Sequence, residues 1–124
     1  MILVVNGDAG VSRALVRALN SRGYSSLAVP DGHTAHLVLD REPIEAIILD
    51  LDQPRTGGSK LLEMIRRDLR FRRLPVIMCA AQPSQEEQSN LERLGVRAIV
   101  ARADDSELLL RQLAIVLPQS SPLT

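Results

Sequence analysis

Residues 46–58, AIILDLDQPRTGG, constrain the fold of this chain more than any other segment. A run of four apolar residues, short enough for a buried strand, is followed at once by Asp50 and then by Asp52, Pro54 and a pair of glycines. The chain is therefore expected to leave the core at Asp50 and to turn there. In an open parallel α/β sheet, the carboxyl ends of the strands are where ligands bind. We therefore interpret Asp50 as marking a functional site.

Further short apolar runs alternate with helical patterns along the whole chain. Ser84 and Glu87 have the spacing of a capping box, which predicts the start of one helix. Repeated strand and helix units with right-handed crossovers predict a parallel sheet that is covered by helices on both faces. The strands are expected at 2–5, 25–29, 46–49, 76–79 and 98–100, and the helices at 11–22, 33–41, 58 to the segment before Pro75, 84–94 and 104–116.

The composition indicates one domain without a strong electrostatic preference. The 124 residues include fifteen basic and fifteen acidic side chains, so no net charge favours nucleic acid or an anionic membrane. The apolar run at 2–5 is too short for a signal peptide, and no stretch approaches the ~18 apolar residues of a membrane span. One cysteine, Cys79, allows no internal disulfide. We expect a soluble, cytoplasmic protein with a domain at 1–117 and a polar tail or linker at 118–124.

With these elements placed, the chain resembles the receiver domain of two-component response regulators over roughly residues 1–117. The resemblance implies a flavodoxin-like, doubly wound (βα)5 three-layer sandwich with strand order 2-1-3-4-5. It also implies a non-enzymatic signalling domain of a phosphorelay. The motifs that carry the resemblance are ILVV at the start, Gly23-Tyr24, Asp31-Gly32, IILDLDQP with Gly58 four residues after its proline, Pro75-Val76-Ile77, and Gly95 before the last strand.

The resemblance implies that Asp50 is the phospho-acceptor. In the family, Mg²⁺ is held by this aspartate and by an acidic pair after the first strand, and it neutralises the charge on the phosphoryl oxygens. Here the acidic pair falls on Asn6 and Gly7, and Asp8 is acidic but one residue late. Asp52 occupies the position whose backbone carbonyl lies near the metal. The expected ligands are therefore Asp50, Asp8 and Asp52, with Mg²⁺ binding weak or absent.

In this family, a few residues switch the domain between two states. At these positions the sequence departs further from the family's residues. The hydroxyl residue that would bond the phosphoryl group maps to Ala80, which has no donor, and the reporter aromatic maps to Ile99. The lysine maps to Arg102, whose charge could still reach a phosphoryl group or Asp50 itself, and the proline after it maps to Ala103. We therefore interpret the chain as a divergent receiver. An alternative is a protein-binding module that does not depend on phosphorylation.

The implied partners are a histidine kinase or another signalling protein. A homodimer could form through the face made by the helix at 84–94, the strand at 98–100 and the last helix, by resemblance to other receivers. We expect no membrane and no nucleic acid partner. Two other functions are compatible with these residues: a nucleotide- or flavin-binding protein of the same layered fold, and a hydrolase in which Asp50 and Asp52 act as a carboxylate pair.

An arginine cluster stands apart from this site. Five arginines fall between positions 66 and 73, around the end of the third predicted helix. A solvated helix face is the plain interpretation. The alternative is a docking patch for an acidic partner or for phosphate.

Overall fold

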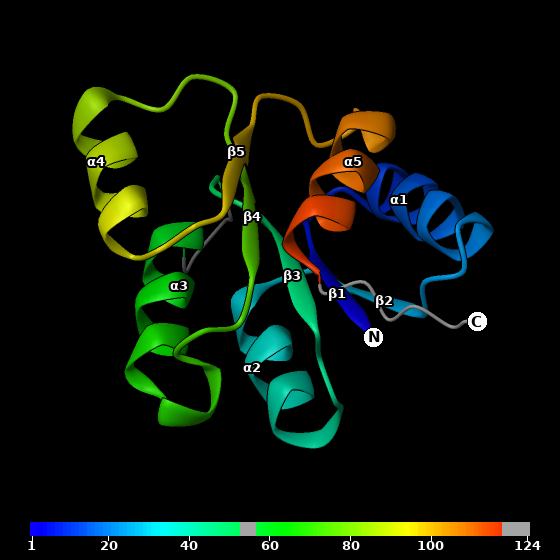
Figure 1. Ribbon diagram of the computed structural model, residues 1–124, viewed down its shortest axis with the longest axis horizontal. Coiled ribbons are helices and arrows are strands. Elements are labelled where there is room, and N and C mark those ends of the chain that lie inside the picture. Colours follow the sequence, from blue (N-terminus) through cyan, green and yellow to red (C-terminus); the bar gives the residue numbers. More distant parts are fainter. Residues whose placement is uncertain (53–56, 118–124) are drawn as a thin grey trace.

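The computed structural model describes residues 1–52 and 57–117, and they form a single parallel sheet with helices on both faces (Figure 1). The strand order is β2-β1-β3-β4-β5. The strands are β1 Ile2–Val5, β2 Ser26–Val29, β3 Ala46–Asp50, β4 Val76–Cys79 and β5 Ala98–Val100, and the helices are α1 Ala9–Ser21, α2 Gly32–Arg41, α3 Gly58–Arg67, α4 Gln85–Arg93 and α5 Ser106–Val116, with a 3-10 turn η1 at Leu69–Phe71. The predicted fold class and strand order are confirmed.

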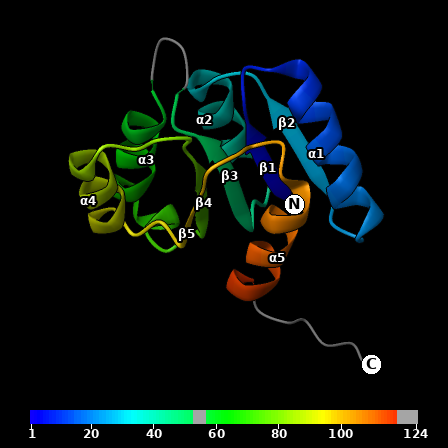
Figure 2. The same cartoon turned by 90° about the horizontal axis from the view of Figure 1, so that it is seen from above.

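The helices divide unequally between the two faces of the sheet. Helices α2, α3 and α4 cover one face and α1 and α5 the other, as the two perpendicular views show (Figures 1 and 2). Successive strand residues alternate between these faces: Leu3 and Val5 pack under α2 and α3, whereas Ile2 and Val4 pack under α1 and α5. Both faces of the central strands are therefore buried, which is why they are continuous apolar runs.

The helix starts follow the polar residues that cap them. Helix α1 begins at Ala9, two residues before the apolar stripe predicted, because the Asp8 carboxylate accepts the backbone N–H groups of Gly10 and Val11. The capping box of α4 is confirmed, with reciprocal bonds between Ser84 and Glu87. Each of these caps fixes the loop that joins a strand's carboxyl end to the next helix.

Two predictions fall partly outside the described residues. The predicted turn at Pro54 lies in the segment 53–56, and the predicted tail is the segment 118–124. Among the helices that the structure describes, none has the length and apolar character needed to cross a membrane.

Candidate functional site

The candidate site lies at the carboxyl edge of the sheet, where Asp50 is the last residue of β3. The parallel registers pair Val5 with Leu49 and Asp50 with Cys79. Asn6, which follows β1, and Ala80, which follows β4, therefore come next to the two flanks of Asp50. The fold thus brings the sequence-predicted acceptor, the acidic-pair position and the hydroxyl position to one edge.

The Asp50 carboxyl group is half-buried. Burial raises its pKa, although a hydrogen bond from the Asp52 backbone N–H to Asp50 Oδ1, at 3.1 Å, opposes the rise, and the negative charge of Asp52 adds to it. Burial, together with the charge of Asp50, also raises the pKa of the Cys79 thiol to about 12. Cys79 is therefore a neutral core residue at this edge and is unsuited to act as a nucleophile.

Asp8 is directed at the start of α1. Its Oδ1 accepts the N–H of Gly10 at 2.9 Å and that of Val11 at 3.1 Å. Its own N–H donates to the side-chain Oδ1 of Asn6 at 2.8 Å, and the Asn6 side chain is buried. The side chains of Asn6 and Asp8 therefore accept backbone N–H groups in the loop after β1 and at the start of α1.

The start of α3 passes close to the backbone of Asp50, and glycines stand at this point of the chain. Gly57 has a φ of 77°, a conformation that side chains other than glycine rarely adopt. A Cβ on Gly58 would lie 2.5 Å from the Asp50 carbonyl oxygen, and the Gly58 N–H donates to the Leu51 carbonyl at 2.9 Å. The glycine that the resemblance marked is thus needed for the backbone to pass Asp50.

The predicted switch positions lie in β5 and in the segments that follow β4 and β5. Ala80 is buried, and its N–H donates to the Val100 carbonyl. Ile99, in β5, is partly buried against the core under α2, α3 and α4. Arg102 is exposed and forms a two-point ion pair with Asp104, with Nε to Oδ1 at 3.0 Å and Nη2 to Oδ2 at 2.8 Å. The guanidinium of Arg102 is thereby bonded within its own loop rather than to Asp50.

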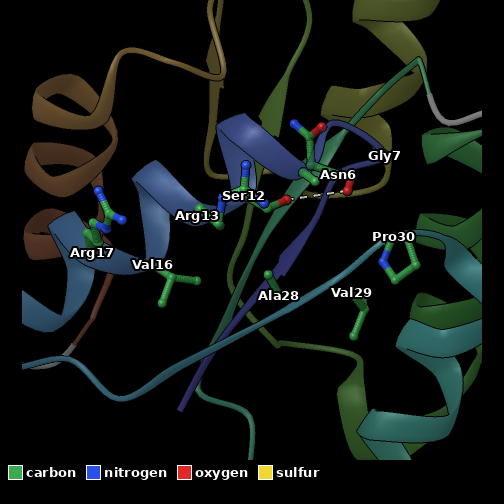
Figure 3. A pocket seen from close by; sticks show the side chains of 10 residues that line it. Asn6, Gly7, Ser12, Arg13, Val16, Arg17, Ala28, Val29 and Pro30 are labelled. Atoms are coloured by element: carbon green, nitrogen blue, oxygen red, sulfur yellow. Dashed lines mark hydrogen bonds between the residues drawn. The ribbon is translucent and has the colours of Figure 1, made fainter.

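An apolar pocket of about 430 Å³ opens between α1 and β2 near the same edge. Figure 3 shows Asn6 and Ser12 at one end of it, where the Ser12 hydroxyl donates to the Asn6 carbonyl at 3.3 Å, and Val29 and Pro30 from the end of β2. Asp50 does not line this pocket. The pocket is therefore lined in part by Asn6 and Gly7, the acidic-pair position, and is separate from Asp50.

The described residues do not gather a cluster of three metal-binding side chains at this edge. Over residues 1–52 and 57–117, no three His, Cys, Asp or Glu side chains are grouped so that they could hold a metal ion. Asp8 accepts a backbone N–H group of α1, and Asp52 is exposed. Of the three expected ligands, Asp50 is the one that ends a strand at the carboxyl edge. Weak or absent Mg²⁺ binding at Asp50 stays a prediction.

The predicted arginine cluster separates into members with different surroundings. Arg70 pairs with Asp68 at 2.7 Å and Asp40 at 2.8 Å, and its guanidinium lies 4.7 Å from the centre of the Phe71 ring. Arg66 is half-buried and donates to four backbone carbonyls, those of Phe71, Leu74, Leu94 and Gly95. This structural role of Arg66 was missed, because its partners are main-chain atoms with no signal in the sequence.

Comparison with known proteins decides the family. The family model described as "Response regulator receiver domain" matches residues 2–116. The chain belongs to this family. It is 28% identical over 122 residues to the phosphate regulon transcriptional regulatory protein PhoB of Pseudomonas aeruginosa, covering 98% of this chain and 53% of PhoB. It is 27% identical over 109 residues to the chemotaxis protein CheY of the same organism, covering 87% of this chain and 88% of CheY.

Solved structures agree with this assignment. A response regulator receiver protein from Pseudomonas putida superimposes with a TM-score of 0.86 at 28% identity, covering 92% of this chain and 94% of that one. The chemotaxis protein CheY4 of Vibrio cholerae gives a TM-score of 0.87 at 22% identity, covering 94% and 97%, and shows the shared fold. The receiver domain is a non-enzymatic signalling module, so the assignment favours signalling over the hydrolase and flavin alternatives.

The lengths of the relatives limit what the family assignment covers. The receiver domain described here spans about half the length of PhoB and 27% of the transcriptional regulatory protein GlrR of Escherichia coli. By contrast, it covers most of the chemotaxis protein. The family therefore assigns the domain and its place in two-component signalling.

Proposed function

We propose that Asp50 accepts a phosphoryl group in this receiver domain, but that the metal and switch positions are too depleted for phosphorylation to drive an efficient conformational change. The domain then binds a histidine kinase or another signalling protein largely in its unphosphorylated state. The observation that best supports this proposal is the set of bonds made by the charged groups at the carboxyl edge of the sheet. Asp8 accepts the α1 amides and Arg102 pairs with Asp104, which leaves Asp50 without a charged partner among the described residues.

The chemistry assigned to Asp50 is a phosphoryl transfer. A carboxylate oxygen of Asp50 would form a bond to the phosphorus of a small donor or of a phosphohistidine, while the bond from phosphorus to the leaving group breaks and the leaving group takes that electron pair. The ionised carboxylate is the nucleophile. Because burial raises the pKa of Asp50, this form predominates only above the raised value.

The absence of a hydroxyl group at Ala80 reduces the free energy that phosphorylation could supply to a conformational change. A hydrogen bond to a charged group contributes about 1.5 to 3 kcal/mol, and Ala80 cannot donate one. Moving a two-state equilibrium from 1:99 to 99:1 requires about 5.5 kcal/mol of differential binding. Losing this bond removes a large part of that energy, which supports binding that does not depend on phosphorylation.

Two attributes inferred with this function stay predictions. One is a homodimer through α4, β5 and α5, where Gln88, Glu92 and Arg111 are exposed. The other is a cytoplasmic location. Nothing in the phosphoryl chemistry above depends on either.

The test compares the natural site with a restored one. A Gly7→Asp, Ala80→Ser double variant returns an acidic residue and a hydroxyl to the two positions at which the family carries them. Beryllofluoride with Mg²⁺ is added to ¹⁵N-labelled protein and amide shifts are recorded. We expect small changes in the natural chain, large changes in the double variant, and none when Asp50→Asn is added to it.

Two outcomes would contradict the proposal. A natural chain that responds as fully as the double variant would mean that its site is already competent. A double variant that stays silent, although its circular dichroism matches that of the natural chain, would remove Asp50 as the acceptor.

A further inference from the structure

The amino edge of the sheet, opposite Asp50, carries a hollow lined by arginines. It has a volume of about 380 Å³ and lies where the chain enters β4 and β5. No acidic side chain is among the residues that line it. The lining residues are Arg66, Arg72, Arg73, Arg93, Leu94, Gly95 and Arg97.

The packing of α3 against the end of α4 assembles this hollow from separate parts of the sequence. Arg66 Nε donates to the Leu94 carbonyl at 2.7 Å, and its Nη2 donates to the Gly95 carbonyl at 3.2 Å. The Arg97 N–H donates to the Val76 carbonyl at 2.9 Å. These bonds hold the end of α4 and the start of β5 beside the segment after η1, so the wall of the hollow is well defined.

The arginines of the hollow differ in what their side chains bond. Arg66 is committed to backbone carbonyls, and burial and the charge of Arg97 lower its pKa. Arg72, Arg73 and Arg97 are exposed, and in the described part of the chain their side chains have neither an ion pair nor a hydrogen bond. Three guanidinium groups are therefore available to a ligand.

The nearby charges do not cancel this excess. Arg93 donates to Asn90 Oδ1 at 2.6 Å, a neutral acceptor that leaves its charge uncompensated. Glu42 lines an adjoining hollow together with Arg72 and Arg73, but forms no ion pair with either in the residues described. Asp68 and Asp40 are already paired with Arg70.

We propose that this hollow binds a small molecule that carries at least two phosphate groups. Guanidinium groups match phosphate oxygens with paired N–H donors, and several of them in one place favour a multivalent anion. A concave site of this size suits a small molecule, whereas an extended acidic chain would need a longer groove. The site is at the opposite edge of the sheet from Asp50 and is independent of phosphoryl transfer there.

The test uses inorganic pyrophosphate and tripolyphosphate as probes. Each is titrated into ¹⁵N-labelled protein at constant ionic strength, with orthophosphate as the low-charge comparison. We expect saturable shifts of the amides at 93–97 and 72–74, with tripolyphosphate binding more tightly than orthophosphate. Arg72→Ala and Arg97→Ala should each weaken tripolyphosphate binding by about tenfold, the loss expected for one charged hydrogen bond.

Arg67→Ala and Arg111→Ala are the matched controls. Both remove an exposed arginine that does not line the hollow, and Arg67 directly follows Arg66, so they should leave the affinity for tripolyphosphate unchanged. Equal losses in the controls and in Arg97→Ala would overturn the proposal, because binding would follow net charge alone.

Two further probes test other anions at the same residues. A deca-glutamate peptide or a short DNA duplex that shifts the same amides at lower concentration than tripolyphosphate would overturn the proposal in favour of an acidic protein or a nucleic acid. The absence of saturable shifts with millimolar tripolyphosphate would also overturn it.

Discussion

Burial makes ionisation of the Asp50 carboxyl group less favourable in the folded chain than in the unfolded one. Burial raises its folded pKa above the unfolded value of 3.8, so the folded state binds more protons between these two values, and the free energy of unfolding falls as pH rises through them. Asp50→Asn removes this cost while keeping an acceptor for the Asp52 N–H. We expect the variant to be more stable than the natural chain at pH 7, and the difference to vanish below pH 3.8.

Urea unfolding followed by circular dichroism at a series of pH values measures this difference. Glu92→Gln removes an exposed carboxyl group from α4 and serves as the control, with an expected effect within about 0.5 kcal/mol. A gain in stability for Asp50→Asn that stayed constant down to acidic pH would show that ionisation of Asp50 is not its cause.

Asp8 caps helix α1. Two variants of Asp8 distinguish this role from that of a metal ligand. Asp8→Asn keeps a side-chain oxygen for the N–H groups of Gly10 and Val11, whereas Asp8→Ala does not. We expect Asp8→Ala to lower the free energy of unfolding by about 1 kcal/mol and Asp8→Asn to change it little. A Mg²⁺ titration of both variants completes the test: a large loss of affinity in Asp8→Asn would assign Asp8 to the metal instead.

At the scale of elements, the turn between β3 and α3 depends on Gly58. A Cβ there would meet the Asp50 carbonyl oxygen at 2.5 Å and the Leu51 Cα at 2.7 Å, and both are backbone atoms that cannot move aside cheaply. Gly58→Ala should therefore lower the free energy of unfolding by about 1 to 3 kcal/mol. It should also disturb the amide signals of Asp50 and Asp52.

Gly10→Ala is the matched control for this element. Gly10 lies in the first turn of α1, and its added Cβ would meet only the Asp8 side chain, at 3.3 Å. Thermal unfolding of the two variants compares them directly. Equal stability of Gly58→Ala and the natural chain would mean that the loop can move away from β3 without cost.

The elements that the sequence predicted best are those whose signal is local. The bounds of β1, β4 and β5 agree with the apolar runs, because a buried parallel strand is a short apolar run between turn residues. The capping box at Ser84 was also found from spacing alone. The start of α1 was placed late because the apolar stripe begins at Val11, while the helix begins where Asp8 can cap it.

The site was predictable in position but not in bonding. The parallel sheet required Asp50 to reach the carboxyl edge, yet the sequence could not tell whether Asp8 and Arg102 turn toward it. Each bonds groups two or three residues away in the sequence, and such local bonds compete with long-range ones without changing the residue pattern. The arginine hollow was harder still, because Arg72 and Arg97 meet only through the packing of α3 and α4.

At the scale of the whole molecule, the sheet separates the two edges for which we propose functions. Strands β3 and β4, of five and four residues and rising ~3.3 Å per residue, place the Asp50 edge and the arginine hollow roughly 13 to 16 Å apart. Coupling over such a distance needs an element with two discrete arrangements that both sites bias. The hydroxyl and aromatic residues that provide one in the family, by resemblance, are Ala80 and Ile99 here.

We therefore expect the two edges to act independently. The effects of Asp50→Asn and Arg97→Ala on the free energy of unfolding should add within about 0.5 kcal/mol, as they do for distant sites without shared partners. Tripolyphosphate should bind equally well with and without beryllofluoride. Denaturant unfolding of the single and double variants measures the first, and amide shifts measure the second. A coupling of 1 kcal/mol or more would require a switch that runs through β4 or β5, and would make phosphorylation of Asp50 a regulator of the arginine hollow.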